Sequence, residues 1–107
     1  MGKSLARSTL HMDPSILKNA IGSWYHQDAY LDFASDEEIW ADIFASHDPA
    51  MRSLLAAQLA ELLQQSDSAI LVLWNGEAHS HTFTSGDEAR SFLGAMHKFF
   101  EDREHGA

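Results

Sequence analysis

Residues 48–63 read DPAMRSLLAAQLAELL and decide the fold, because their apolar side chains recur at helical spacing over the whole stretch. Asp48 is a good N-cap, and Pro49 suits the first helical position, where its missing N–H needs no partner. The apolar positions are Met51, Leu54, Leu55, Leu59, Leu62 and Leu63. This pattern predicts a long amphipathic helix.

Two more helices are predicted on the N-terminal side of this stretch. The cap-and-proline pair Asp13-Pro14 begins the first, which we expect to extend to about residue 25. Ser35 and Glu38 form a capping-box pair that begins the second. Its apolar stripe is Ile39, Trp40, Ile43 and Phe44. Between the two helices, residues 26–34 lose the helical period, which predicts an irregular connection held by its aromatic side chains.

The C-terminal side is predicted to hold one long helix and one ambiguous segment. Ser85 and Glu88 form a second capping box, followed by an apolar face that continues to Phe100. Residues 67–74 are either a short buried helix or, with the turn residues Asn-Gly that follow, the start of a hairpin. We therefore expect a mainly α fold, a compact single-domain bundle of about five helices, with a small β-hairpin around residues 69–84 as the alternative to a further helix.

Length and composition limit the class of protein. The chain has 107 residues, enough for one domain with one core, and its lack of cysteine excludes disulfides and thiolate metal sites. The N-terminus has no apolar region of signal-peptide length, so export by a signal peptide is not expected, and the lack of cysteine is compatible with a reducing cytoplasm. We expect residues 12–107 to form the domain, and residues 1–11 to be a cloning remnant or a disordered N-terminus.

Acidic residues dominate the middle of the chain. The net charge is −9, and residues 19–89 hold twelve Asp or Glu against one basic residue, Arg52. This distribution argues against direct binding of DNA or RNA, since no basic surface can be assembled there. It suits either a basic protein partner or a well-solvated surface that binds nothing.

The segment 24–44 combines this acidity with aromatic rings and contains no Lys or Arg. Rings can fill pockets in a partner, and carboxylates can steer a cationic partner toward them. The candidate contact residues are Tyr25, His26, Gln27, Asp28, Tyr30, Asp32, Asp36, Glu37, Glu38 and Asp42. Each also has a structural interpretation: the tyrosines as core, the histidine as a hydrogen-bonding residue, and the carboxylates at 36–38 as charges that offset the helix dipole.

The run Trp-Tyr-His-Gln-Asp-Ala-Tyr-Leu-Asp-Phe at residues 24–33 resembles the aromatic-His-Gln-Asp stretch of small immunity proteins from bacterial contact-dependent growth inhibition systems. The Leu-rich helix, an element ending near Trp74, and a last helix containing Ala-Arg-Ser-Phe-Leu at 89–93 are similar to that family in their order. The resemblance implies a cytoplasmic, non-enzymatic antitoxin that binds the toxic C-terminal domain of a cognate effector, frequently a nuclease. It also favours the helix over the hairpin.

Two other functions stay open at this level. A small acidic regulatory or adaptor domain would use the same surface to bind another basic protein. A metal-binding protein would use His79 and His81, which lie on one side of an extended chain and could hold zinc with a third ligand, although the signal is weak and a solvated loop is the favoured explanation. The sequence has no phosphate-binding loop, nucleophile elbow or H-E-x-x-H motif, so neither an enzyme nor a cofactor is expected.

Overall fold

The computed structural model describes residues 13–106, with side chains up to residue 104, and these residues form helices joined by short connections, without a strand. The helices are α2 (Ser15–Trp24), α3 (Ala29–Asp32), α4 (Asp36–Ala45), α5 (Pro49–Leu63), α6 (Asp67–Glu77) and α7 (Gly86–Gly106). The predicted mainly α fold is confirmed. The prediction for residues 1–11 lies outside the described residues.

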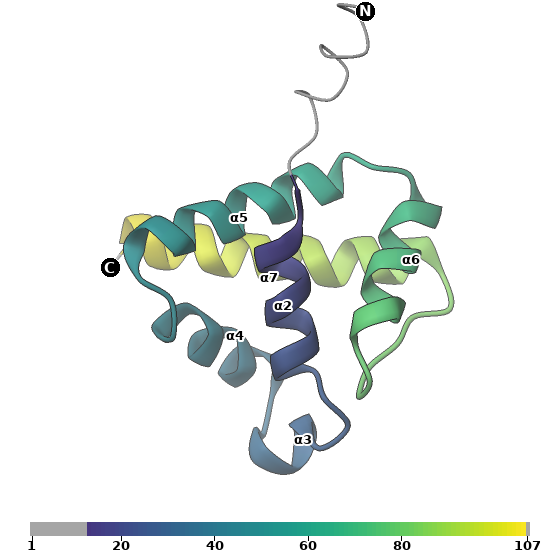
Figure 1. Cartoon of the computed structure of the whole chain (residues 1–107), viewed down its shortest axis with the longest axis horizontal. Helices are drawn as coiled ribbons and strands as arrows, with labels where there is room; N and C mark the ends of the chain where they lie inside the picture. Colours follow the sequence, from purple (N-terminus) through teal and green to yellow (C-terminus); the bar gives the residue numbers. More distant parts are fainter. Residues whose placement is uncertain (1–12, 107) are drawn as a thin grey trace, which may run out of the picture.

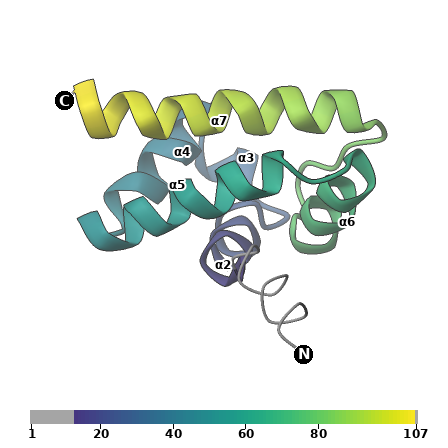
Figure 2. The same cartoon turned by 90° about the horizontal axis from the view of Figure 1, so that it is seen from above.

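α7 is the longest helix and lies along one side of the molecule, with the other helices on one face of it (Figure 1, Figure 2). α5 and α7 lie side by side and run in opposite directions in both views (Figure 2). α2 crosses this pair at a steep angle, while α4 and α6 pack against α7 toward its two ends. The single turn α3 follows α2 and lies at the edge of the molecule, away from α5.

The core is formed where α2, α4, α5, α6 and α7 converge. Trp74 is fully buried at its centre, with its ring centroid 4.9 Å from that of Tyr25 and 5.3 Å from that of Phe92. Edge-to-face pairs of this kind add to the free energy gained by burying the rings. The core thus joins the end of α2 to α6 and α7 and gives α3 a rigid base.

The stripe predicted for α5 is buried only in part. Leu55, Leu59 and Leu62 have 5% or less of their surface exposed, whereas Met51 and Leu54 are 36% and 41% exposed. α2 crosses α5 over its C-terminal half and so leaves the first turns uncovered (Figure 1). Sequence periodicity shows which face is apolar, but not how far along the helix a neighbour covers it.

The hairpin predicted as an alternative for residues 69–84 is wrong, because residues 67–77 form the helix α6. Ser66 Oγ accepts the Ala69 N–H at 3.1 Å and so caps the helix. The segment that would have been the second strand bonds instead to one side chain: the Asn75 amide donates to the carbonyl of Phe83 and accepts its N–H, both at 2.9 Å. This pair holds the connection between α6 and α7 against α6.

The first helix begins differently from the prediction. α2 starts at Ser15, one residue after Pro14, and has no local side-chain cap. Gln58 of α5 supplies one instead, since its Oε1 accepts the Leu17 N–H at 3.0 Å. Gln58 is only 6% exposed, so this bond also satisfies a buried amide oxygen. A cap that comes from 41 residues away leaves no local signal in the sequence.

The other predicted caps are confirmed. Asp48 Oδ1 accepts the Met51 N–H at 2.9 Å at the start of α5, and Ser85 Oγ accepts the Glu88 N–H at 3.2 Å at the start of α7. At α4, Ser35 Oγ accepts the Glu38 N–H at 3.2 Å, as a capping box requires. The Glu38 carboxylate reaches back one residue further than in the usual box, to the N–H of Ala34.

The starts of α6 and α7 are held together by Asp67, Gly86 and Arg90. The Arg90 guanidinium donates to Asp67 Oδ1 at 2.7 and 3.1 Å, and to the carbonyls of Leu63 and Gln65 at the end of α5 at 2.5 and 2.9 Å. The end of α5, the start of α6 and the first turns of α7 are thereby joined by one side chain. A planar guanidinium can make these bonds together, whereas a lysine ammonium cannot match the geometry.

Gly86→Ala is expected to lower the free energy of unfolding by about 1–3 kcal/mol, because overpacking forces the backbone apart. A β-carbon at Gly86 would come closer to Cβ and Cγ of Asp67 than atoms can approach without displacement. The control is Gly94→Ala in the same helix, where a β-carbon meets nothing within 4 Å. This control should gain about 0.5–1 kcal/mol from helix propensity. Urea unfolding of both variants measures the effect, and a change of the same sign in both would contradict this close contact.

Candidate functional site

The candidate contact residues differ in how far the structure exposes them. Seven have exposed side chains: Gln27, Asp28, Tyr30, Asp32, Glu37, Glu38 and Asp42. His26 and Asp36 are partly buried, and Tyr25 is completely buried. A partner can therefore contact the first group directly, whereas Tyr25 can influence a partner only through the residues that it positions. We use the name α3 surface for the exposed candidates between positions 27 and 38, which are Gln27, Asp28, Tyr30, Asp32, Glu37 and Glu38.

Asp36 connects α2, α3 and α4. It is the first residue of α4, and its Oδ1 accepts the hydroxyls of Tyr25 at 2.9 Å and Tyr30 at 2.6 Å. Tyr25 in turn accepts the indole N–H of Trp40 at 3.0 Å. The two tyrosines and Asp36 were predicted as separate contacts, and the structure brings them into one network. One carboxylate oxygen of Asp36, Oδ1, is therefore occupied by hydrogen bonds within the protein.

His81 extends this network to the connection between α6 and α7. Its Nδ1 lies 2.9 Å from the Tyr30 hydroxyl. Since the Tyr30 proton is donated to Asp36, His81 Nδ1 must carry the proton and donate to the tyrosine oxygen. The His81 carbonyl also accepts the indole N–H of Trp74 at 2.6 Å. His81 therefore links Tyr30 of α3 to the connection between α6 and α7 and to the core residue Trp74. The sequence did not predict this role.

Both tyrosines are held in the protonated state. Burial, followed by the charge of Asp36, raises the pKa of Tyr25 well above its usual value. Burial, followed by the hydrogen bond to Asp36, raises the pKa of Tyr30. Since an ordinary tyrosine is already protonated at neutral pH, the raised pKa values extend the donor state of both hydroxyls to more alkaline pH.

The chain should show no tyrosinate absorbance near pH 10 until it unfolds. Its only two tyrosines are Tyr25 and Tyr30, and the ordinary pKa of the side chain is 10.0. The folded state keeps both protons, while the unfolded state releases them above about pH 10. The stabilisation is therefore complete below about pH 10 and is lost as the pH rises further. An ultraviolet pH titration followed in parallel by circular dichroism tests this; tyrosinate appearing while the helices stay intact would contradict it.

His26 shapes the turn before α3. Its Nδ1 accepts the Asp28 N–H at 3.1 Å, and its Nε2 lies 3.7 Å from the Asp32 carboxylate. Both carboxylates remain largely in solvent, with the Asp32 side chain 60% exposed. The histidine therefore positions the two aspartates of the α3 surface and leaves them accessible.

Asp42 lies one helical turn beyond Glu38 and has a structural bond of its own. Its Oδ2 accepts the indole N–H of Trp24 at 2.8 Å, which ties α4 to the end of α2. Its side chain is nevertheless exposed. The remaining candidates on α4, Glu37 and Glu38, are exposed in the first turn, where negative charge is favourable to the helix dipole, and the Glu38 carboxylate also accepts the Ala34 N–H.

One exposed residue of this region escaped the sequence analysis. Leu31 in α3 is 84% exposed, the largest value among the large apolar side chains that the structure describes. Residues 26–34 have no period, so their sequence could not show which side chains point outward.

The histidine pair considered as a metal site is not accompanied by a third ligand. His81 is bonded to Tyr30, and among the described residues no group of three His, Cys, Asp or Glu side chains lies close enough to share an ion. The functional groups around α3 are carboxylates, the Tyr30 hydroxyl and the His81 ring.

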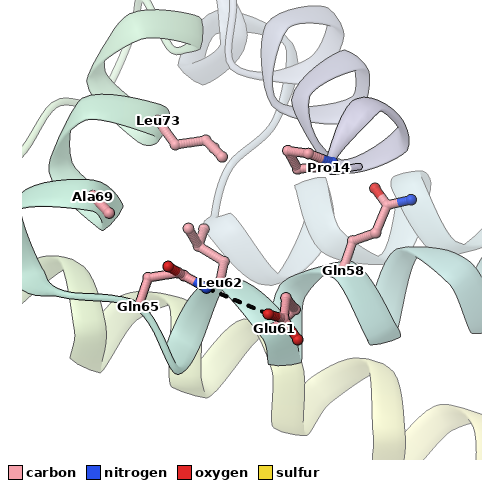
Figure 3. A pocket seen from close by; sticks show the side chains of 7 residues that line it. All are labelled: Pro14, Gln58, Glu61, Leu62, Gln65, Ala69 and Leu73. Atoms are coloured by element: carbon pink, nitrogen blue, oxygen red, sulfur yellow. Dashed lines mark hydrogen bonds between the residues drawn. The ribbon is translucent and has the colours of Figure 1, made fainter. Parts of the chain in front are cut away.

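A hollow lies between α2, α5 and α6, away from the α3 surface (Figure 3). Its volume is about 230 Å³, and its lining is mostly apolar, with Leu62 and Leu73 on two of its sides. At its rim the Gln65 amide donates to the Glu61 carboxylate at 3.4 Å. The hollow brings together no set of groups suited to catalysis.

These features describe a small helical domain whose distinctive surface is acidic and aromatic and is carried by a turn at the edge of the fold. The chain belongs to the CdiI immunity protein family, since the model of that family matches residues 14–95. The match confirms the resemblance seen at residues 24–33 and includes all ten candidate contact residues. Comparison with curated proteins and with solved structures gave no match. No helix within residues 13–106 has the length and apolar character needed to cross a membrane.

Proposed function

We propose that this protein is an immunity protein that binds and neutralises the toxic C-terminal domain of a cognate contact-dependent growth inhibition effector. Membership of the CdiI family carries the proposal. We further propose that the toxin is a nuclease with a basic surface, that the antitoxin has no catalytic role, and that it acts in the cytoplasm of the cell that it protects.

The charge of the α3 surface supports a basic partner. Asp28, Asp32, Glu37 and Glu38 are exposed within a segment that has no Lys or Arg between residues 19 and 51. A nuclease must attract phosphates and so presents Lys and Arg around its active site. An acidic inhibitor competes for those side chains, and the opposite fields accelerate association. The same acidity would suit an adaptor for another basic protein, and the family favours a toxin.

Co-expression tests this function directly. Cells that express the toxin domain of the cognate effector should stop growing, and co-expression of the chain should restore growth. The two proteins should co-purify at low salt and separate more readily at high salt, because the contact is partly electrostatic. A toxin domain that arrests growth equally with and without the chain, and does not co-purify with it, would refute the proposal.

A further inference from the structure

The turn α3 presents an apolar side chain in the middle of the acidic surface. Leu31 is 84% exposed, although Ala29 in the same turn is completely buried. A single exposed leucine is common in proteins and proves nothing alone. Leu31, however, belongs to a turn at the edge of the fold whose other exposed residues include carboxylates (Figure 1). This combination suggests a binding role.

The backbone of this turn is fixed independently of Leu31. The side chain of Ala29 is completely buried and anchors α3 on the core. Tyr30, the neighbour of Leu31, is bonded through its hydroxyl to Asp36 and His81. The backbone at Leu31 is therefore held by its neighbours, and only the side chain of the leucine would lose freedom on binding. Preorganisation of the backbone lowers the entropic cost of association.

The charges around Leu31 indicate what it would contact. Asp28 is the residue immediately before α3, and Asp32 is the last residue of α3, so both exposed carboxylates belong to the same turn as Leu31. Neither carboxylate is neutralised by a Lys or Arg within the described residues. A complementary site has an apolar floor for the leucine and Lys or Arg at its rim, which is also the composition of a groove that binds the bases and phosphates of a single strand.

We propose that α3 inserts into the nucleic-acid-binding groove of the toxin, with Leu31 as the apolar anchor and Asp28 and Asp32 as the partners of cationic side chains at the rim. The proposal rests on the function proposed above and identifies the part of the surface that dominates the affinity. Leu31 controls how long the complex lasts, while the aspartates control how fast it forms.

Binding kinetics of the full chain with the catalytically inactivated toxin domain of the cognate effector test the proposal. Leu31→Ala should raise Kd about 30-fold or more, through faster dissociation, as expected for a central anchor. Val72→Ala is the matched control, since Val72 is 75% exposed on α6 and both residues contribute little to the core. It should leave Kd within about 2-fold. Leu31→Met, which keeps the apolar volume, should retain most of the affinity.

The outcomes separate this inference from the proposed function. If the unaltered chain binds the toxin domain and Leu31→Ala has no more effect than Val72→Ala, the anchor is refuted and the immunity function stands. If the unaltered chain does not bind, both proposals fail. Competition by a single-stranded oligonucleotide adds a second readout: the unaltered chain should displace it from the toxin, and a ternary complex would refute insertion into the groove.

Discussion

Reversing two charges, with Asp28→Lys and Asp32→Lys, is expected to slow association with the toxin domain by about 10-fold or more at low salt, because steering depends on the local field. The association rate of this double variant should also depend less on ionic strength than that of the unaltered chain. Both side chains are exposed, and Asp28 makes no side-chain cap at α3. The fold should therefore tolerate the change, and circular dichroism would verify this.

The control for this prediction must change the same charge elsewhere. Glu101→Lys with Asp102→Lys alters the net charge equally on the C-terminal part of α7, where the two side chains are 54% and 68% exposed. If the field is local to α3, this control should associate at close to the normal rate. If both double variants associate with the toxin domain equally slowly, the net charge of the chain, and not the α3 surface, determines the association rate.

The second large effect is expected on stability. Asp36→Ala should lower the free energy of unfolding by about 2–4 kcal/mol, since it removes two hydrogen bonds to a carboxylate and leaves the buried Tyr25 hydroxyl without its acceptor. Glu37→Ala is the matched control, because Glu37 occupies the same first turn of α4 and is exposed. It should cost about 0.5 kcal/mol or less, the loss of a charge near the helix N-terminus.

A double-mutant cycle makes the test of this network specific. Tyr25→Phe should destabilise the unaltered protein clearly, but should cost less when Asp36 is already alanine, with a coupling of about 0.5–3 kcal/mol. Additive effects of the two substitutions in urea unfolding would show that the hydrogen bond between Tyr25 and Asp36 contributes nothing to stability.

Local signals account for what the sequence predicted correctly. The caps Ser35, Asp48 and Ser85 act within four residues of their own positions, so their pattern is sufficient to locate the helix starts. The apolar stripes of α4, α5 and α7 follow from the helical period alone. The acidic and aromatic character of residues 24–44 could likewise be read directly, as could the resemblance that the family match confirms.

Contacts between distant residues account for what the sequence did not predict. The hairpin was wrong because Asn75 satisfies the backbone of Phe83 with its side chain, which replaces the strand pairing that the pattern suggested. The start of α2 depends on Gln58, and the orientation of Tyr30 depends on His81, each more than 40 residues away in the chain. Tyr25 looked like a contact residue by type and is instead the buried support of Asp36.

The α3 surface must be the part of the protein that the toxin covers if it determines binding. Hydrogen exchange of the chain, free and bound to the inactivated toxin domain, measures this most directly. We expect the largest gain in protection at residues 26–38, with little change at the C-terminal end of α7. Protection confined to α5 or α7, with residues 26–38 exchanging as in the free protein, would contradict the account.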